Sequence, residues 1–358
     1  MKRKILSGIF VMLAFLLVGT AWADTIDPAV YTDTLAVGES VTVRKTVVID
    51  DKAPTGGILD VMFLIDTSGS MGGVIDAAKT AAADIITELA GFGDVATGVG
   101  YYSEPGSKGV YRDLTTDSAA GVAAVGDISV GVDGSGYGGD FPEEGINAVY
   151  EAATEASWRT GSTRFIIALG DATFKESDGT TLAMAQAALD SSGATFIGLD
   201  YSSMTRDEWG GISPEALGAI ITASGLDTAD LVDDITDGIT DEFETYTSVT
   251  VSDLAAGMPG VGVSVAAVSG EGSIVDGDTF VGDFDRSAVR TFEFDVTFTG
   301  MAEGTHTFDT LALVNDGAVA VEKDSITVGG APVPEPATIL LLGCGLFGLV
   351  GLRRKNKK

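Results

Sequence analysis

One stretch constrains what this chain can fold into more than any other. It runs from Ile58 to Ile65 as a largely apolar segment, stops at Asp66, and continues as Asp-Thr-Ser-Gly-Ser-Met. A run of this kind is typical of a buried strand in a parallel sheet, where both faces are covered. The glycines that follow permit a tight loop, and apolar residues at helical spacing predict a helix over about 74–90.

Three oxygen-bearing side chains occupy alternate positions of this loop: Asp66, Ser68 and Ser70. Open α/β sheets bind ligands at the carboxyl ends of their strands, and alternate residues of an extended turn can point the same way. Oxygen-only ligands suit a hard cation such as Mg²⁺, Ca²⁺ or Mn²⁺. Ser and Asp are also common helix N-caps without any metal, so these residues alone leave both interpretations open.

The sequence from Asp66 to Met71 resembles the metal-ion-dependent adhesion site of von Willebrand factor type A domains. In that family Asp-x-Ser-x-Ser is joined by a distant Thr and a distant Asp. The resemblance covers about 57–246 and implies a doubly wound, mostly parallel α/β sheet with helices on both faces. It also implies a divalent cation held by the first motif and by Asp171, which follows a second apolar strand at 165–169.

The second loop departs from the family pattern, because Asp140 stands where the Thr is expected. With Asp140 as a ligand, three carboxylates would face one dication. That arrangement weakens the attraction for a partner's carboxylate and favours tighter holding of the cation, as ligand charge does elsewhere. The alternative is that Asp140 caps the helix that Pro142 begins.

Strand-like and helix-like segments alternate through the middle of the chain, which predicts a parallel, doubly wound sheet. After Tyr246 the pattern is all-β, and the segment 40–49 is also rich in β-branched residues. These early strands are expected to pair with the late ones in one β-sandwich, with the α/β unit inserted. The predicted strands are 95–102, 165–169, 194–199, 248–251, 261–268, 291–299 and 325–328, and the predicted helices are 119–124, 142–158, 182–189, 214–224 and one around 231–243.

Both ends of the chain have the composition of export signals. A basic start, an apolar run over 5–18 and Ala-Trp-Ala before Asp24 predict a cleaved signal peptide. Near the other end, Pro334-Glu335-Pro336 precedes an apolar run over 337–352 and a basic terminus. As a helix this run spans about 24 Å, and flanking basic side chains can make up the difference to a bilayer core.

The C-terminal arrangement resembles the PEP-CTERM sorting signal of exopolysaccharide-producing Gram-negative bacteria. The resemblance implies processing by an exosortase, a membrane-embedded protease, after transient anchoring in the inner membrane. A permanent single-pass anchor is the alternative. The only cysteine, Cys344, lies in this tail, so the body between the two ends has no internal disulfide.

Charge and residue types exclude several functions. The formal charge is −31, and nucleic acid is not an expected partner because its binding needs a basic patch. The body has one histidine, His306, and no cysteine. It therefore lacks the residues that a nucleophilic triad or zinc-dependent hydrolysis needs. The acidic residues around Asp276 to Asp285 lack EF-hand spacing and fit turns better. We therefore expect no enzyme.

These features predict an exported surface or exopolysaccharide-matrix protein. It would bind a divalent cation at Asp66, Ser68, Ser70, Asp140 and Asp171 and mediate adhesion to an unknown protein or polysaccharide. The alternative is a structural matrix component whose cation serves stability. The expected segments are a signal peptide (1–23), N-terminal strands and linker (24–56), an α/β domain (57–246), a β-sandwich-like domain (247–328), a Gly/Pro spacer (329–336) and a transmembrane sorting tail (337–358).

Overall fold

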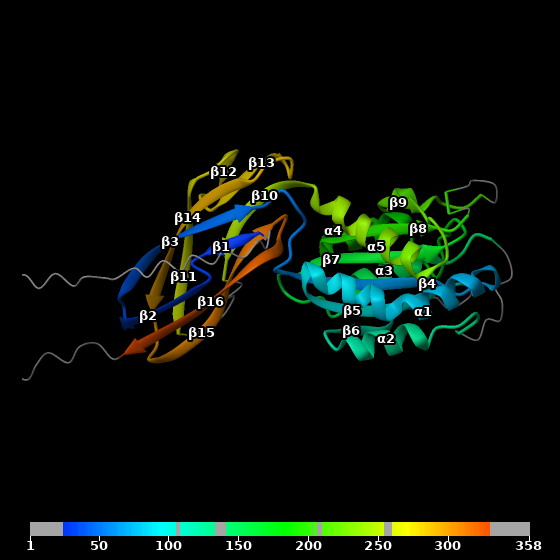
Figure 1. Cartoon of the computed structure of the whole chain (residues 1–358), viewed down its shortest axis with the longest axis horizontal. Coiled ribbons are helices and arrows are strands. Elements are labelled where there is room, and N and C mark those ends of the chain that lie inside the picture. The colour runs from blue at the N-terminus through cyan, green and yellow to red at the C-terminus, as the bar shows by residue number, and fades with distance from the viewer. Residues whose placement is uncertain are drawn as a thin grey trace, which may run out of the picture.

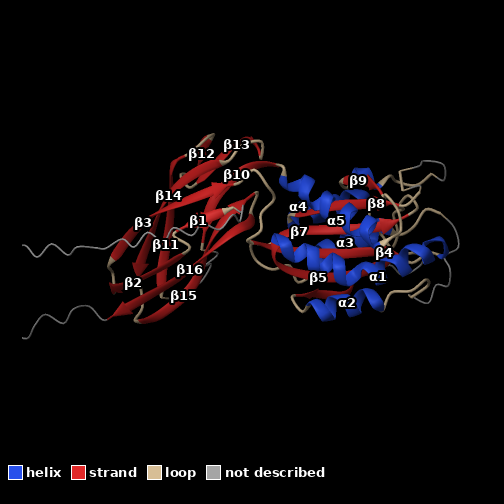
Figure 2. Cartoon of the chain, in the orientation of Figure 1, coloured by secondary structure: helices blue, strands red, loops and turns tan. Residues whose placement is uncertain are grey.

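The computed structural model describes residues 24–104, 108–132, 141–202, 204–205, 210–253 and 260–329. The signal peptide, Asp140 and the sorting tail lie outside these residues. The described chain forms a β-sandwich and an α/β unit (Figure 1). Strands alone build the sandwich, whereas helices cover the sheet of the other unit (Figure 2).

The α/β unit is organised around the strand that ends at Asp66. This strand, β4, lies in the middle of a six-stranded sheet and is parallel to both of its neighbours. Only β6 runs antiparallel, at one edge. In sheet order the strands are β6 (Lys108–Thr115), β5 (Gly93–Tyr102), β4 (Gly57–Asp66), β7 (Thr163–Gly170), β8 (Ala194–Asp200) and β9 (Ala219–Thr222).

In the described part of the chain, five α-helices cover the two faces of this sheet. Alternate side chains of a strand point to opposite faces, and both sets of β4 are apolar, which explains the long apolar run. Phe63 packs with α1, α2 and α5, whereas Leu64 packs with α3 and α4. The helices are α1 (Gly72–Leu89), α2 (Ser118–Gly126), α3 (Gly145–Glu155), α4 (Leu182–Ser192) and α5 (Thr228–Phe243).

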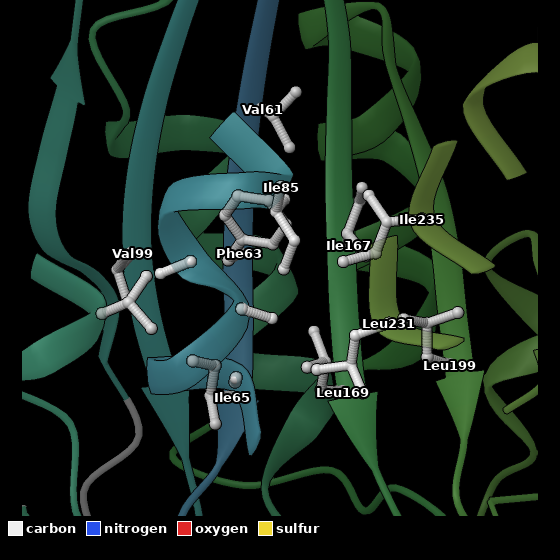
Figure 3. Packing of buried hydrophobic residues seen from close by; sticks show 14 of the residues in the cluster. Val61, Phe63, Ile65, Ile85, Val99, Ile167, Leu169, Leu199, Leu231 and Ile235 are labelled. Atoms are coloured by element: carbon white, nitrogen blue, oxygen red, sulfur yellow. The ribbon is translucent and has the colours of Figure 1, made fainter. Parts of the chain in front are cut away.

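Figure 3 shows the first of these two cores. Phe63 of β4 lies between Val99 of β5 and Ile167 of β7, its partners in the sheet, and all three are nearly inaccessible to solvent. Burial of side chains of this size contributes about 1.5–3 kcal/mol each. The sheet is thereby held rigid up to the strand ends, where the candidate site begins.

The sandwich combines strands from both ends of the described chain. In one sheet β3 pairs with β14 over ten residues, and in the other β2 pairs with β16 in parallel. The α/β unit is therefore inserted between the early and the late strands. One sheet holds β1 (Thr25–Asp27), β3 (Ser40–Ile49), β14 (Arg290–Gly300) and β11 (Val261–Ser269), and the other holds β12 (Ser273–Val275), β13 (Thr279–Asp285), β10 (Thr245–Ser252), β15 (Gly304–Val314), β16 (Gly317–Gly329) and β2 (Val30–Ala36).

Alternation within β14 shows why these strands form a sandwich. Phe292, Phe294, Val296 and Phe298 occupy every second position and are fully buried. The residues between them are polar or only partly buried. One face of the strand thus supplies core and the other faces outward, as expected for a two-layered antiparallel structure.

Arg286 connects the two units. Its guanidinium donates two hydrogen bonds to the Asp24 carboxylate, at 2.8 and 2.7 Å. It also donates to the carbonyl of Asp50, at 2.9 Å, and to that of Phe243 at the end of α5, at 2.8 Å. A single buried side chain therefore joins the first strand, the linker into β4 and the exit from the α/β unit.

The predicted fold class is confirmed: a doubly wound, mostly parallel sheet and an all-β sandwich. One predicted element is wrong. The segment 214–224 is not a helix but a short 3₁₀ turn, Pro214–Ala216, followed by β9. Gly218 explains the difference, because a Cβ there would lie 2.2 Å from the Phe196 carbonyl oxygen. The close approach and the β-branched residues after it favour an edge strand.

Other differences concern boundaries and omissions. The helix predicted over 142–158 begins at Gly145 and ends at Glu155. The strand predicted at 325–328 is the end of the much longer β16. Strands β12, β13 and β15 were not expected, and no helix occurs in the described residues 260–329.

Candidate metal centre

Asp66 is the innermost residue of the candidate site. It ends β4, next to the end of β5, and its side chain is fully buried. Its Oδ1 accepts the backbone N–H of Ser68 at 2.8 Å, which fixes the turn. Its Oδ2 has no hydrogen-bond partner among the described atoms. Such an oxygen is costly to bury, so a group that pairs with it would be strongly favoured.

The two serines of the motif lie together. The Oγ atoms of Ser68 and Ser70 are 3.1 Å apart. Ser68 stands at the N-cap of the 3₁₀ turn Gly69–Met71, yet its side chain makes no capping hydrogen bond. Met71 is the N-cap of α1 and makes none either. The capping interpretation therefore lacks its characteristic hydrogen bond at both positions.

Asp171 approaches the same place from the neighbouring strand. It follows Gly170, the last residue of β7, and Leu169 of β7 is paired with Ile65 of β4. Ser70 hydrogen-bonds the Asp171 carboxylate, and Asp171 raises the pKa of Asp66 through its charge. The structure thus brings together Asp66, Ser68, Ser70 and Asp171.

The environment of the site raises the pKa of both of its carboxylates. Burial, and secondarily the charge of Asp171, raises the pKa of Asp66 to about 7. Burial also raises the pKa of Asp171, against the hydrogen bond from Ser70. The cause is the same for both, because two carboxylates lose water in one small volume. A divalent cation would relieve both effects, since it favours the ionised form of each group.

The donor set fits a hard cation. Asp171 Oδ1, like Asp66 Oδ2, is buried without a hydrogen-bond partner among the described atoms. Two carboxylates and two hydroxyls supply only oxygen, which Mg²⁺, Ca²⁺ and Mn²⁺ prefer. Within the described ranges no group of three or more His, Cys, Asp or Glu side chains is placed to hold a metal. The hydroxyls are therefore essential to this assignment.

Asp140, the remaining predicted ligand, lies outside the described residues, so its role stays a prediction. The described residues on one side of it touch the motif: the N–H of Gly131 donates to the carbonyl of Thr67 at 2.9 Å. On the other side, the N–H of Glu144 donates to the carbonyl of Ser103 at 3.2 Å. Ser103 directly follows β5, so these contacts also lie at the carboxyl ends of the strands.

Sequence reasoning missed Tyr102 and Glu143. The Tyr102 hydroxyl is fully buried and donates to the Leu169 carbonyl at 3.1 Å. Burial raises its pKa well above the usual range, and the charges of Asp66, Asp171 and Glu143 add to this. The sequence favoured a helix-start role for Glu143, but α3 begins two residues later and the Glu143 side chain is buried beside the site.

The other sequence candidates lie away from this centre. His306 is a residue of β15 whose Nε2 lies 2.9 Å from the Ala302 carbonyl oxygen. Asp276 has a positive φ of 54° in the turn between β12 and β13, a conformation that Asp tolerates in turns. Asp285 accepts hydrogen bonds from Ser287. These contacts are those of turn and strand residues.

A family model matches the C-terminal part of the chain. Residues 332–355 match the family model of the PEP-CTERM protein-sorting motif, which confirms that prediction. This match implies recognition by an exosortase and supports an exported cell-surface protein. No curated protein matches the chain.

Several solved structures are similar to the chain. A von Willebrand factor type A protein from Catenulispora acidiphila is 17% identical with a TM-score of 0.35, over 88% of this chain and 74% of that one. The pilus adhesin SpaC from Lactobacillus rhamnosus GG is 17% identical with a TM-score of 0.38, over 83% and 46%. Proximal thread matrix protein 1 from the mussel byssus is 15% identical with a TM-score of 0.37, over 57% and 48%.

The chain spans about half the length of the last two proteins. At these scores the likeness adds nothing to the site, whose assignment depends on its own geometry. None of the helices in the described part of the chain is long and apolar enough to span a membrane. The predicted membrane segment, 337–352, lies outside that part.

Proposed function

We propose that this exported protein holds one divalent cation at Asp66, Ser68, Ser70 and Asp171 and uses it to bind a ligand at the cell surface or in the surrounding matrix. The observation that carries the proposal is the pair of buried carboxylate oxygens without partners, Asp66 Oδ2 and Asp171 Oδ1, beside two hydroxyls. Such a group is expensive to maintain unless a cation completes it.

The placement of the site supports ligand binding. Asp66 and Ser68 are buried, whereas Ser70 and Gly69 are exposed. A cation bound by the buried carboxylates would therefore be exposed to solvent on the side of Ser70. A hard cation completes its shell with oxygen atoms, and a carboxylate, hydroxyl or carbonyl of a partner can take such a position.

The alternative is a structural cation. Asp66 ends β4 and Asp171 follows the neighbouring strand β7, so a cation between them would clamp the ends of these strands. In this case the cation raises stability but not adhesion. Both proposals treat the chain as a binding protein, since one histidine and no cysteine outside the tail do not supply a nucleophilic triad or a zinc site for hydrolysis.

Titration calorimetry with Mg²⁺, Ca²⁺ and Mn²⁺ tests the site. We expect one binding event that Asp66→Ala abolishes and Ser70→Ala weakens. Asp76→Ala is a matched control, because Asp76 is an exposed carboxylate early in α1. Unchanged binding in both site variants would remove the cation from this place.

Retention on isolated matrix polysaccharide or cell-surface protein separates adhesion from structure. The adhesion proposal expects retention that a chelator reverses and that Ser70→Ala reduces while the protein stays folded. Retention that is equal with and without chelator, together with intact cation binding in calorimetry, would favour the structural alternative.

A further inference from the structure

A lysine is buried inside the β-sandwich. Lys45 of β3 is completely inaccessible to solvent, and its Nζ is in contact with Glu322 Oε1. A second carboxylate, Asp324, lies 3.9 Å from the same nitrogen through its Oδ1. Both acids belong to β16, in the sheet opposite β3. This cluster has no part in the cation site.

Two aromatic rings and the hydroxyl of Thr310 lie beside the cluster. The Lys45 nitrogen lies 5.0 Å from the ring centre of Tyr31 and 5.4 Å from that of Phe298. Thr310 Oγ1 donates to Asp324 Oδ2 at 2.6 Å. Glu322 Oε2 and Asp324 Oδ1 are buried without hydrogen-bond partners among the described atoms.

Two acids and one amine cannot all be charged here without an uncompensated negative charge. Burial disfavours ionised forms, and it raises the pKa of Glu322 to about 7. Burial also raises the pKa of Asp324, against the hydrogen bond from Thr310. One proton passed from Lys45 to Glu322 turns an ion pair into a neutral amine in contact with a neutral carboxylic acid.

An amine held against a carboxylic acid in a dry pocket is arranged for condensation. Fixed proximity removes most of the entropic barrier to a reaction between two groups. Lys45 and Glu322 are both inaccessible to solvent, which disfavours hydrolysis of an amide between them. Thr310 anchors Asp324 with its Oδ1 3.9 Å from the amine nitrogen, so a small movement of this side chain brings it to the distance that proton transfer needs.

We propose that Lys45 and Glu322 condense into an intramolecular amide that joins β3 to β16. The lone pair of Lys45 Nζ attacks Glu322 Cδ and forms the C–N bond. Asp324 takes the proton released by the nitrogen and passes it to the departing hydroxyl, so the C–O bond breaks and one water molecule leaves. No oxidant, reductant or further reactant is consumed.

The position of the bond gives it a mechanical consequence. Residues 45 and 322 are 277 positions apart, and the α/β unit lies between them. The body has no cysteine, so an amide is a covalent link that its residues can make. Because β16 leads into the sorting tail, the bond would secure the last strand of a surface-held protein to the opposite sheet.

Tryptic mapping of the denatured full-length protein tests this directly. Trypsin does not cleave after an acylated lysine. We therefore expect residues 45–52 to appear joined to residues 291–323, at the summed mass of the two peptides less one water. Fragmentation should place the junction on Lys45 and Glu322. Normal cleavage after Lys45, with both peptides free, would overturn the proposal.

The tryptic map also shows whether Glu322 or Asp324 is joined to Lys45. Trypsin cuts after Lys323, between Glu322 and Asp324. A branch carried by the peptide that begins at Asp324 would therefore overturn the assignment of Glu322. Lys323 is itself an internal control, because it contacts Asp309 at 2.7 Å on the exposed surface. This solvated pair should remain unlinked.

Variants test the role of each group. Lys45→Arg and Glu322→Gln should lose the branched peptide completely. Asp324→Asn keeps both reacting groups, and we expect loss of the branched peptide because the proton acceptor is gone. Full linkage in Asp324→Asn would exclude Asp324 as the proton-transferring residue. The wild-type map decides the bond itself even where a variant does not fold.

Discussion

Replacing Asp66 by asparagine should make the cation-free protein more stable at alkaline pH while removing its response to cations. Asparagine keeps the shape and the oxygen that accepts the Ser68 N–H, but it carries no charge. The buried ionised carboxylate is the destabilising element in the cation-free state, because it loses water and faces Asp171. The same carboxylate is the principal ligand in the proposed site.

The magnitude follows from the pKa of Asp66, which is raised from 3.8 to about 7. A difference of about three pKa units between the folded and unfolded chain corresponds to about 4 kcal/mol at 1.36 kcal/mol per unit. Because the folded pKa is raised, the stabilisation of the folded chain by protonated Asp66 is fully present below the unfolded pKa. It is lost as the pH rises through the folded value, and the loss therefore falls between pH 3.8 and about 7.

Urea unfolding in the presence of a chelator measures this difference in the free energy of unfolding between wild type and variant. Near pH 4 the wild type and Asp66→Asn should have similar free energies of unfolding. By about pH 8.5 the variant should be more stable by up to about 4 kcal/mol. Saturating Mg²⁺ should then stabilise only the wild type, by about 2.7 kcal/mol when the cation is at one hundred times its Kd.

Asp76→Asn provides the control, because Asp76 is exposed on α1 and should show neither effect. A stability difference between wild type and Asp66→Asn that stays constant between pH 4 and 8.5 would show that the Asp66 carboxylate does not destabilise the cation-free protein. Equal stabilisation of the variant by Mg²⁺ would refute the ligand role separately.

Two further predictions concern the junction and the tail. Arg286→Met should lower the free energy of unfolding by about 3–5 kcal/mol, because it leaves the buried Asp24 carboxylate without its positively charged partner. Arg112→Met is the control, because it breaks an exposed ion pair with Asp127. It should lower the free energy of unfolding by less than about 1 kcal/mol in the same assay. Intact-mass measurement of protein extracted from the cell surface should show chains that lack the tail, and recovery of chains ending at Lys358 would instead indicate a permanent anchor.

The sequence predicted the parts of the fold that depend on local pattern. An apolar run such as that of β4 has few alternatives, because only a strand covered on both faces buries all of it. The loop after Asp66 was equally predictable, since glycines and alternating oxygen side chains leave a recognisable pattern. The resemblance to von Willebrand factor type A domains then implied that Asp171 lies near Asp66, and the structure brings these two residues together.

What the sequence did not predict depends on contacts between distant segments. The apolar residues of the segment 214–224 suit a helix or a strand, and only the close approach of Gly218 to the Phe196 backbone decides in favour of β9. Glu143 was assigned to a helix start because acidic residues are common there. Its burial beside Tyr102 results from the packing of three separate loops, which no local pattern encodes.

The two ends of β4 lie on opposite sides of the α/β unit, one beside the sandwich and the other at the candidate site. β4 begins at Gly57, where a Cβ would lie 2.6 Å from the Ala318 carbonyl oxygen of the sandwich, and it ends at Asp66. β16 begins beside that same contact and runs away from it to Gly329, where the described chain ends. The candidate site and the exit toward the sorting tail therefore lie at opposite ends of the structure (Figure 1). A protein held through its C-terminal end would direct Ser70 and the proposed cation away from the point of attachment, toward a partner.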